Sequence, residues 1–164
     1  MEIRVDVKME DLVFFNIPFF RQFFVIVREI SGSKRALPIL TSELGFLNIS
    51  QALIGQTTSR PTTLDTFVRL VEALGYQFDK GVVTRLDTGA YLGRLFLSKS
   101  QGDGGEIWVD CGPSGTIAIC VKQNAPLFVG EELLEQASND EAYKRIVEMV
   151  ERTKGLGDDC SYSA

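Results

Sequence analysis

Histidine is absent from all 164 residues of this chain. Imidazole is the side chain that most often serves as a general base near neutral pH, and it is the commonest protein ligand for transition metals. Its absence excludes catalytic sites built on Ser-His-Asp or Cys-His pairs, and zinc sites that need an imidazole ligand. Carboxylates are the groups that remain for acid–base or metal chemistry.

A long apolar run is also missing, because the most apolar stretch, residues 12–27, is interrupted by Asn16, Pro18, Arg21 and Gln22. A membrane-spanning helix needs about 20 apolar residues, so we expect no transmembrane segment. The first residues alternate between charged and apolar, unlike a secretory signal peptide. We therefore expect a cytoplasmic protein with reduced thiols at all three cysteines, which are Cys111, Cys120 and Cys160.

A surplus of basic side chains is the third absence. The net formal charge is −5, and residues 131–164 carry nine acidic and four basic side chains, so that the rest of the chain is balanced. Proteins that hold phosphate backbones nonspecifically usually show a basic surplus, because each phosphate contact replaces counterions with a cation. The composition argues against bulk affinity for nucleic acid and leaves a local basic patch open.

The residues that are present predict one α+β domain. Hydrophobic residues make up 45% of the chain and charged residues 24%, which is ordinary for a globular protein of this length. We expect a mostly antiparallel sheet with helices packed against it. Strands are predicted at 2–8, 23–30, 35–40, 76–78, 82–86, 91–97, 107–110 and 127–129, and helices at 43–54, 63–74, 114–123, 131–137 and 140–153.

Local signals support several of these boundaries. Thr62 or Thr63 is the predicted N-cap of the second helix, and Gly75 is its stop signal. Pro113 fits the first position of the third helix, where its missing N–H costs nothing. Pro38 favours an edge strand or a bulge, because proline cannot donate to a sheet. The small, polar residues 155–164 predict a flexible acidic tail.

Several short motifs follow one another in an order that resembles the bifunctional nuclease family. They are Leu37-Pro38-Ile39, Arg60-Pro61 with Thr63 and Asp65, Leu70 with Leu74-Gly75, Asp110 with Pro113-Ser114, Ile117-Ala118, and Ala125-Pro126 with Val129. The resemblance covers residues 1–136 and leaves a C-terminal helix, 137–154, and the tail outside it. It implies the fold of that family, a homodimer, and a relationship to enzymes that cut both DNA and RNA.

The chain departs from the family pattern at charged positions. Leu64 stands where a histidine normally precedes the aspartate of the second helix. The Arg-Pro-Ser-Asp box of the family is replaced by Gly112, Pro113, Ser114 and Gly115. These changes remove groups that would position phosphate, hold a metal or move a proton. The apolar framework is kept while the polar chemistry is lost, which suggests a scaffold put to another use.

The turn that contains the altered box is a candidate for phosphate binding. It follows a strand and opens a helix, so its free N–H groups and the helix dipole favour an anion. The candidate residues are Arg60, Ser114, Gly115 and Thr116. The alternative is an ordinary helix start, with Cys111 beside it as a packed, inert thiol.

Carboxylates offer the other route to catalysis. Asp65 and Asp110 are the weak catalytic candidates, with Asp87 and Asp103 as further oxygen ligands for Mg²⁺ or Mn²⁺ in phosphodiester hydrolysis. The alternative is that Asp87 and Asp103 stabilise turns and that Asp65 interacts with a helix dipole. We expect no metal or other cofactor unless the protein is such a nuclease.

Six phenylalanines fall within residues 14–24, where the family has a polar hairpin turn. Adjacent pairs cannot all point to one side of a strand, so some rings must be exposed or covered by another element. The C-terminal helix is one possible cover. A second subunit, a protein partner or a hydrophobic ligand is the other. The predicted interface consists of Phe14, Phe15, Phe19, Phe20, Phe23 and Phe24.

Two hypotheses follow. The preferred one is a non-catalytic interaction or assembly subunit on a nuclease-like scaffold, which binds its partner through this aromatic segment. The alternative is a metal-dependent nuclease that acts on DNA and RNA through carboxylates.

Overall fold

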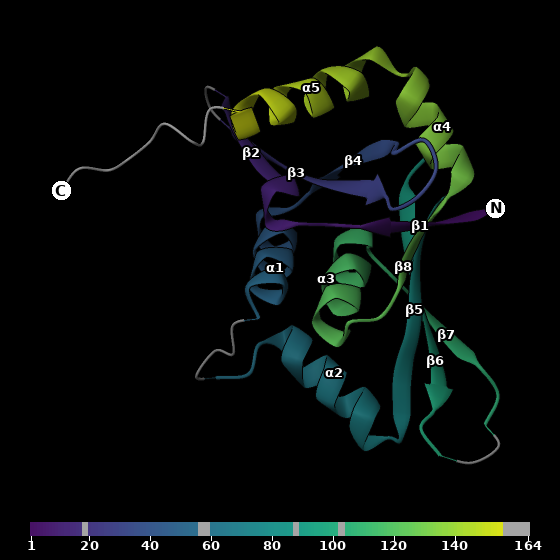
Figure 1. Cartoon of the computed structure of the whole chain (residues 1–164). Helices are drawn as coiled ribbons and strands as arrows, with labels where there is room; N and C mark the ends of the chain where they lie inside the picture. The colour runs from purple at the N-terminus through teal and green to yellow at the C-terminus, as the bar shows by residue number, and fades with distance from the viewer. Residues whose placement is uncertain (18–19, 56–59, 87–88, 102–103, 156–164) are drawn as a thin grey trace.

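The fold was described from a computed structural model, which describes residues 1–17, 20–55, 60–86, 89–101 and 104–155. Within these ranges the chain is an α+β domain with one mostly antiparallel eight-stranded sheet and five α-helices (Figure 1). The strands are β1 (Glu2–Asp6), β2 (Leu12–Ile17), β3 (Phe20–Glu29), β4 (Ala36–Thr41), β5 (Tyr76–Arg85), β6 (Tyr91–Lys99), β7 (Ile107–Cys111) and β8 (Leu127–Gly130). The helices are α1 (Glu43–Ile54), α2 (Thr63–Ala73), α3 (Pro113–Gln123), α4 (Glu131–Asn139) and α5 (Glu141–Gly155), with a 3₁₀ turn at Met9–Asp11.

The strands are ordered β2-β3-β1-β8-β5-β6-β7, and β4 pairs with the other side of β3. The β5–β8 pair is parallel, and every other pair among the described strands is antiparallel. β2 and β1 pair with successive parts of β3, and the 3₁₀ turn lies between them in the chain. β4 and β7 therefore lie at opposite ends of the sheet.

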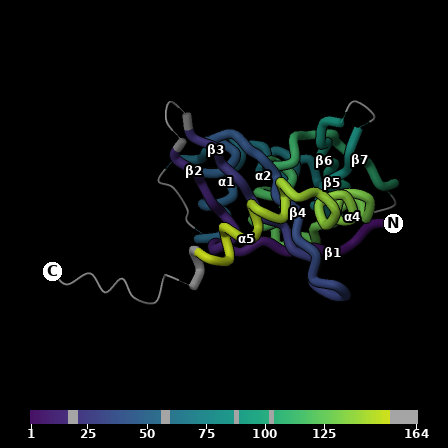
Figure 2. The backbone as a smooth tube through the Cα atoms, turned by 90° about the horizontal axis from the view of Figure 1, so that it is seen from above, coloured from purple at the N-terminus to yellow at the C-terminus, as the bar shows by residue number. Residues whose placement is uncertain are grey.

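The hydrophobic core lies between the sheet and helix α3. Four consecutive residues of α3, from Ile117 to Cys120, are buried, as are Val83 and Leu95 on the facing strands. Helices α1 and α2 flank α3 on the same side of β5 and β8, while α4 and α5 lie over β4 (Figures 1 and 2). The altered box is therefore positioned by the most buried helix of the domain.

Most of the predicted strands are confirmed, with three differences. Residues 12–17 form β2, which the prediction missed because the paired phenylalanines break the period-2 pattern. β3 begins at residue 20, not at 23, because it pairs with β2. Residues 76–85 form one continuous strand, and the apparent gap in the pattern is a register shift between Phe78 and Lys80.

The predicted helices are confirmed to within three residues at each end. Thr62 caps α2 and forms a capping box with Asp65, while Gly55 and Gly75 end α1 and α2 with φ values of 68° and 78°. Leu74 is the C-cap residue of α2, and its side chain is exposed. No helix within the described ranges is both long and apolar enough to cross a membrane.

Candidate functional site

The altered box forms the first turn of α3, directly after β7. Gly112 is the N-cap and Pro113 the first helical residue, as the sequence predicted. Thr116 is fully buried, and its hydroxyl lies 2.8 Å from the Cys111 thiol and 3.3 Å from the Gly112 carbonyl oxygen, to which it donates. Thr116 therefore has its hydroxyl engaged inside the protein.

Two glycines allow neighbouring elements to approach this turn closely. A Cβ atom at Gly93 of β6 would overlap the Thr116 hydroxyl and lie 2.9 Å from the Gly112 carbonyl oxygen. A Cβ atom at Gly45 of α1 would lie 2.7 Å from the Ser114 hydroxyl oxygen. The side chains of Ser114 and Thr116 thus point toward packed neighbours, and the turn is a junction between α1, α3 and β6.

Asp65 is held in place by the start of its own helix and by Lys122 of α3. Its carboxylate lies 2.6 Å from the Lys122 ammonium and accepts hydrogen bonds from the Thr62 backbone and hydroxyl at 2.7 and 2.8 Å. The bond from Lys122, with those from Thr62, holds the pKa of the Asp65 carboxyl well below its usual range. Asp65 thus stabilises the contact between α2 and α3.

Asp110 lies on β7 and is paired with Arg94 of β6. The Arg94 Nε donates to the Asp110 carboxylate at 2.7 Å, and the guanidinium carbon lies 4.1 Å from the centre of the Trp108 ring. Asp65 and Asp110 therefore lie on different elements, each with its own cation. The described residues contain no group of three or more acidic or cysteine side chains placed to hold a metal ion.

The other polar candidates are placed as follows. Arg60 is exposed, two residues before the cap of α2. Burial raises the pKa of the Cys111 thiol, as expected for a packed thiol. Asp87 and Asp103 lie outside the described residues. Phosphate binding by Arg60, Ser114, Gly115 and Thr116 stays a prediction.

An apolar groove of about 430 Å³ lies beside Pro113, and sequence reasoning missed it. The groove is lined by residues from β3, β4, the start of β6, α3 and α5. Because these residues are far apart in the chain, no sequence motif could have predicted the groove. Among the described residues that line it, Tyr91 and Tyr143 carry hydroxyls, which bond to each other across 3.0 Å. Burial, with this bond, raises the pKa of Tyr91 above its usual range. The groove is suited to an apolar group.

The phenylalanine segment forms the β2–β3 hairpin, which places its rings on two faces. On one face Phe14 lies opposite Phe23, and both contact Phe46 of α1, with ring centres 5.2 to 6.5 Å apart. On the other face Phe15 packs against Phe24 at 5.8 Å. Phe14 is 56% exposed and Phe24 only 8%. Residues 18 and 19 and the side chain of Phe20 lie outside the described set.

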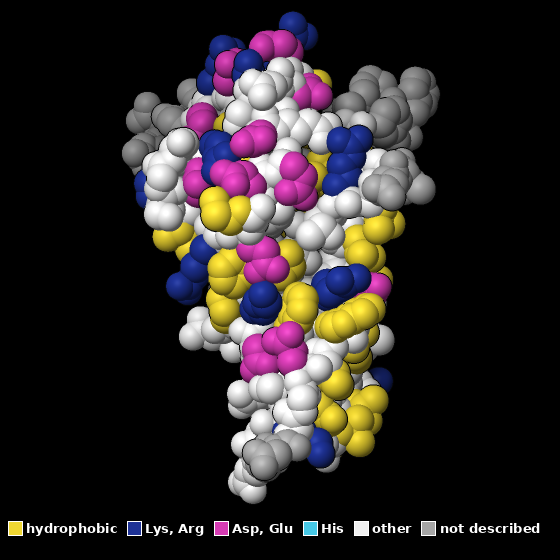
Figure 3. Space-filling view, turned by 90° about the vertical axis from the view of Figure 1, so that its right-hand side faces the viewer, with side chains coloured by type: hydrophobic (Ala, Val, Ile, Leu, Met, Phe, Trp, Pro, Cys, Tyr) yellow, Lys and Arg dark blue, Asp and Glu magenta, His cyan; other side chains and the backbone are white. Residues whose placement is uncertain are grey.

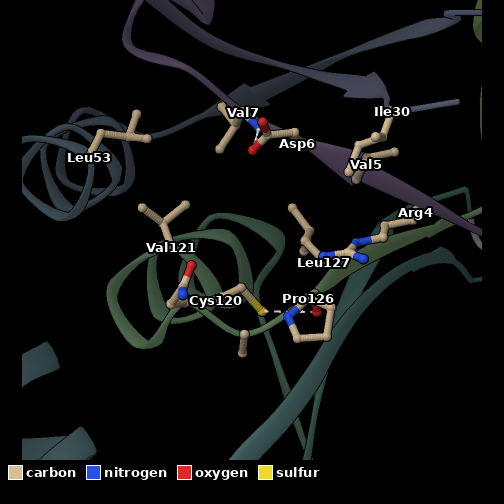
Figure 4. A pocket seen from close by; sticks show the side chains of 12 residues that line it. Arg4, Val5, Asp6, Val7, Ile30, Leu53, Cys120, Val121, Pro126 and Leu127 are labelled. Atoms are coloured by element: carbon tan, nitrogen blue, oxygen red, sulfur yellow. Dashed lines mark hydrogen bonds between the residues drawn. The ribbon is translucent and has the colours of Figure 1, made fainter.

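A separate cavity of about 280 Å³ lies at the far end of α3 from the box (Figure 4). Arg4 and Asp6 of β1 line it together with apolar side chains of α1, α3 and β8. Cys120 also faces this cavity, and burial raises the pKa of its thiol to about 12. None of the residues predicted for catalysis or phosphate binding lines this cavity.

The family assignment is decided by comparison with known proteins. The model of the bifunctional nuclease domain matches residues 25–142. The chain belongs to the bifunctional nuclease domain family. It is 28% identical over 109 residues to bifunctional nuclease 1 of Arabidopsis thaliana, and 27% identical over 109 residues to bifunctional nuclease 2 of Oryza sativa subsp. japonica. These alignments cover 66% of this chain but only 34% of each plant protein, so the chain spans about a third of their length.

An uncharacterized protein of Mycobacterium tuberculosis is 28% identical over 113 residues, which cover 69% of this chain and 65% of that protein. The part of this chain matched by the bifunctional nuclease model begins at Val25. It includes the altered box and most of the residues that line the groove, and it leaves out β2 and all six phenylalanines of residues 14–24. The match therefore includes the second half of β3, from Val25 to Glu29, and does not extend to the rest of the hairpin.

Proposed function

We propose that this bifunctional nuclease family member is a non-catalytic interaction or assembly subunit, which docks a protein partner through the β2–β3 hairpin and assembles as a homodimer. The exposure of Phe14 carries the proposal. Phe14 is 56% exposed next to Phe23 and Phe46, and apolar side chains that gather on an exposed surface mark interaction sites. Aromatic residues are enriched at the centres of protein interfaces.

The surroundings of the hairpin support a protein partner. Helix α1, which supplies Phe46, also exposes Leu44 and Leu47. On the other face of the hairpin, Phe24 lines the apolar groove next to Pro113. An interface of ordinary size needs an apolar centre with a polar rim, and these neighbours extend the apolar area beyond one ring.

The state of the polar candidates supports a non-catalytic role. Asp65, Asp110 and Thr116 each make a short contact with another side chain of the chain, to Lys122, Arg94 and Cys111 respectively. These contacts compete with a substrate or a metal ion for the same groups. This observation favours interaction over hydrolysis.

The test compares two equally exposed apolar residues. Phe14 and Leu70 of α2 are each 56% exposed, and Leu70 lies on another element. We expect Phe14→Ser to lose the proteins that co-purify with the tagged chain from its native cells, while Leu70→Ser retains them. Quantitative mass spectrometry of both eluates measures this. Identical sets of retained partners in the two variants and the unaltered chain would contradict the proposal.

A metal-dependent nuclease is the second candidate, favoured by the names of the plant relatives. It would use Asp65 and Asp110 with Mg²⁺ or Mn²⁺ to cleave single-stranded DNA or RNA. It predicts cleavage that depends on the metal and disappears in Asp110→Asn. Absence of cleavage with either metal, or cleavage that survives this substitution, counts against it.

A further inference from the structure

β7 ends the sheet and leaves apolar side chains exposed on both of its faces. Among the described strands it pairs only with β6. Ile107 and Val109 face the core side, opposite Leu97 and Leu95, yet they are 42% and 38% exposed. Trp108 points to the opposite face and is 54% exposed. An edge strand with three consecutive exposed apolar residues can pair with a strand of another chain.

The two ends of the sheet are protected differently. β4 carries Pro38 and is covered by helices α4 and α5. β7 has neither a proline nor a lysine, which are the residues that usually prevent edge-to-edge pairing. Its one charged residue, Asp110, is neutralised by Arg94. The β7 edge is therefore left open while the β4 edge is closed.

The sheet face beside β7 combines aromatic rings with paired charges. Arg94 lies over Trp108 and binds Asp110, and Lys80 lies 4.6 Å from the centre of the Phe96 ring while it binds Glu2 at 2.8 Å. Figure 3 looks onto this side and shows hydrophobic side chains interspersed with charges of both signs. Phosphate backbones need a surplus of cations. A face whose positive and negative charges balance instead suits a protein surface that carries apolar groups and charges of both signs, such as the same face of a second copy.

We propose that β7 pairs with β7 of a second copy, antiparallel and about a two-fold axis at Val109, so that two sheets become one. In this register Val109 faces its own counterpart, Ile107 faces Cys111, and Trp108 faces Asp110. All core-side pairs are then apolar. Each Trp108 approaches the ion pair between Asp110 and Arg94 of the second copy, and no like charges meet.

The neighbouring register explains why the axis is placed at Val109. An axis at Trp108 would set Glu106 opposite Asp110 of the second copy, and like charges directly opposite are unfavourable in a sheet. An axis at Val109 sets Glu106 opposite the uncharged Gly112. This inference specifies the interface of the homodimer proposed above and does not depend on the role of the hairpin.

The first test uses the single tryptophan of the chain, which lies in the proposed interface. We expect sedimentation velocity to show a dimer, and the Trp108 emission to shift to longer wavelength as dilution dissociates it. Val109→Lys sets two cations opposite each other and should raise the dimer dissociation constant by roughly tenfold or more. Leu70→Lys is the matched control on α2 and should leave the dimer unchanged.

The second test examines the register of the two β7 strands, and it replaces Val109 with a cysteine, which disturbs the fold less than a lysine. With Cys111 and Cys160 replaced by serine, Val109→Cys should form a reducible cross-linked dimer, because residues facing each other at the axis lie within disulfide reach. Leu40→Cys on β4 is the control and should not cross-link. A chain that stays monomeric at all concentrations overturns the inference. So does a dimer that tolerates Val109→Lys, or a Val109→Cys chain that does not cross-link.

The two proposals fail separately. Phe14→Ser should remove the protein partner and leave the dimer intact, whereas Val109→Lys should do the reverse. A dimer lost in Phe14→Ser but kept in Val109→Lys would place the subunit contact on the hairpin and overturn the β7 interface.

Discussion

The β2–β3 hairpin and the first turn of α3 use their residues in opposite ways. The hairpin carries aromatic rings, and part of that apolar surface faces solvent at Phe14. The turn carries hydroxyl groups, and these face inward, with Thr116 fully buried. Residue type alone would have placed the rings inside and the hydroxyls at a solvent-exposed site. The difference teaches that packing density around an element, more than its composition, decides which groups are available for binding.

The two regions also differ in what surrounds them. The turn lies where α1, α3 and β6 meet, and glycines at 45 and 93 let these elements approach closely. The hairpin lies toward one end of the sheet, where Phe46 of α1 contacts the face that carries Phe14 and Phe23. A site for a partner is therefore expected at the hairpin, and a structural role at the turn.

The largest expected effect lies within the hairpin. Phe24→Ala should lower the free energy of unfolding by about 4 kcal/mol, because it removes an almost fully buried ring and leaves a cavity in its place. Phe14→Ala should lower it by less than about 1 kcal/mol, because this ring is already largely in water. Urea unfolding of both variants measures the difference. Equal losses would mean that both faces of the hairpin belong to the core.

The next effect tests the turn as a packing junction. Gly93→Ala should cost about 3 kcal/mol, because the added methyl group would overlap Thr116 and crowd the Gly112 carbonyl oxygen. Gly105→Ala is the matched control, because no atom of the described residues lies within 4 Å of its Cβ position, and it should be near neutral. Thermal unfolding of the two variants provides the comparison. A neutral Gly93→Ala would show that the turn has room to move and would reopen it as a binding site.

The smallest effect concerns the charge on Asp65. Its pKa in the folded protein is well below the ordinary 3.8, so its stabilising contribution is complete above that value and is lost as pH falls through the folded-state pKa. Asp65→Asn should lower the free energy of unfolding by on the order of 1 kcal/mol at neutral pH, and by less at pH below about 4.

Lys122→Met provides the control for this prediction, because it removes the main cause of the low pKa. In that background Asp65→Asn should cost less at neutral pH than in the unaltered chain, as measured by urea unfolding over a pH series. A cost that is independent of both pH and Lys122 would mean that the helix cap alone accounts for the role of Asp65.

Much of the fold followed from local patterns in the sequence. Alternation of apolar and charged residues predicted β1, and proline, threonine and glycine marked the ends of α2 and α3. β2 was missed because adjacent phenylalanines hide a period of two. For the candidate site, the sequence supplied the residues Asp65 and Asp110 but not their partners. Lys122 and Arg94 are distant in the chain, and only the packing of α2 on α3 and of β6 on β7 brings them close.

The sequence by itself determined the α+β class, the membership of the bifunctional nuclease family and the absence of imidazole chemistry, because these depend on residue identity and short-range periodicity. Tertiary structure alone decided which side chains are buried or paired and which are exposed to solvent. Burial and pairing depend on contacts between distant segments, so only the folded chain placed Thr116 inside, Phe14 outside and Trp108 on an open strand edge.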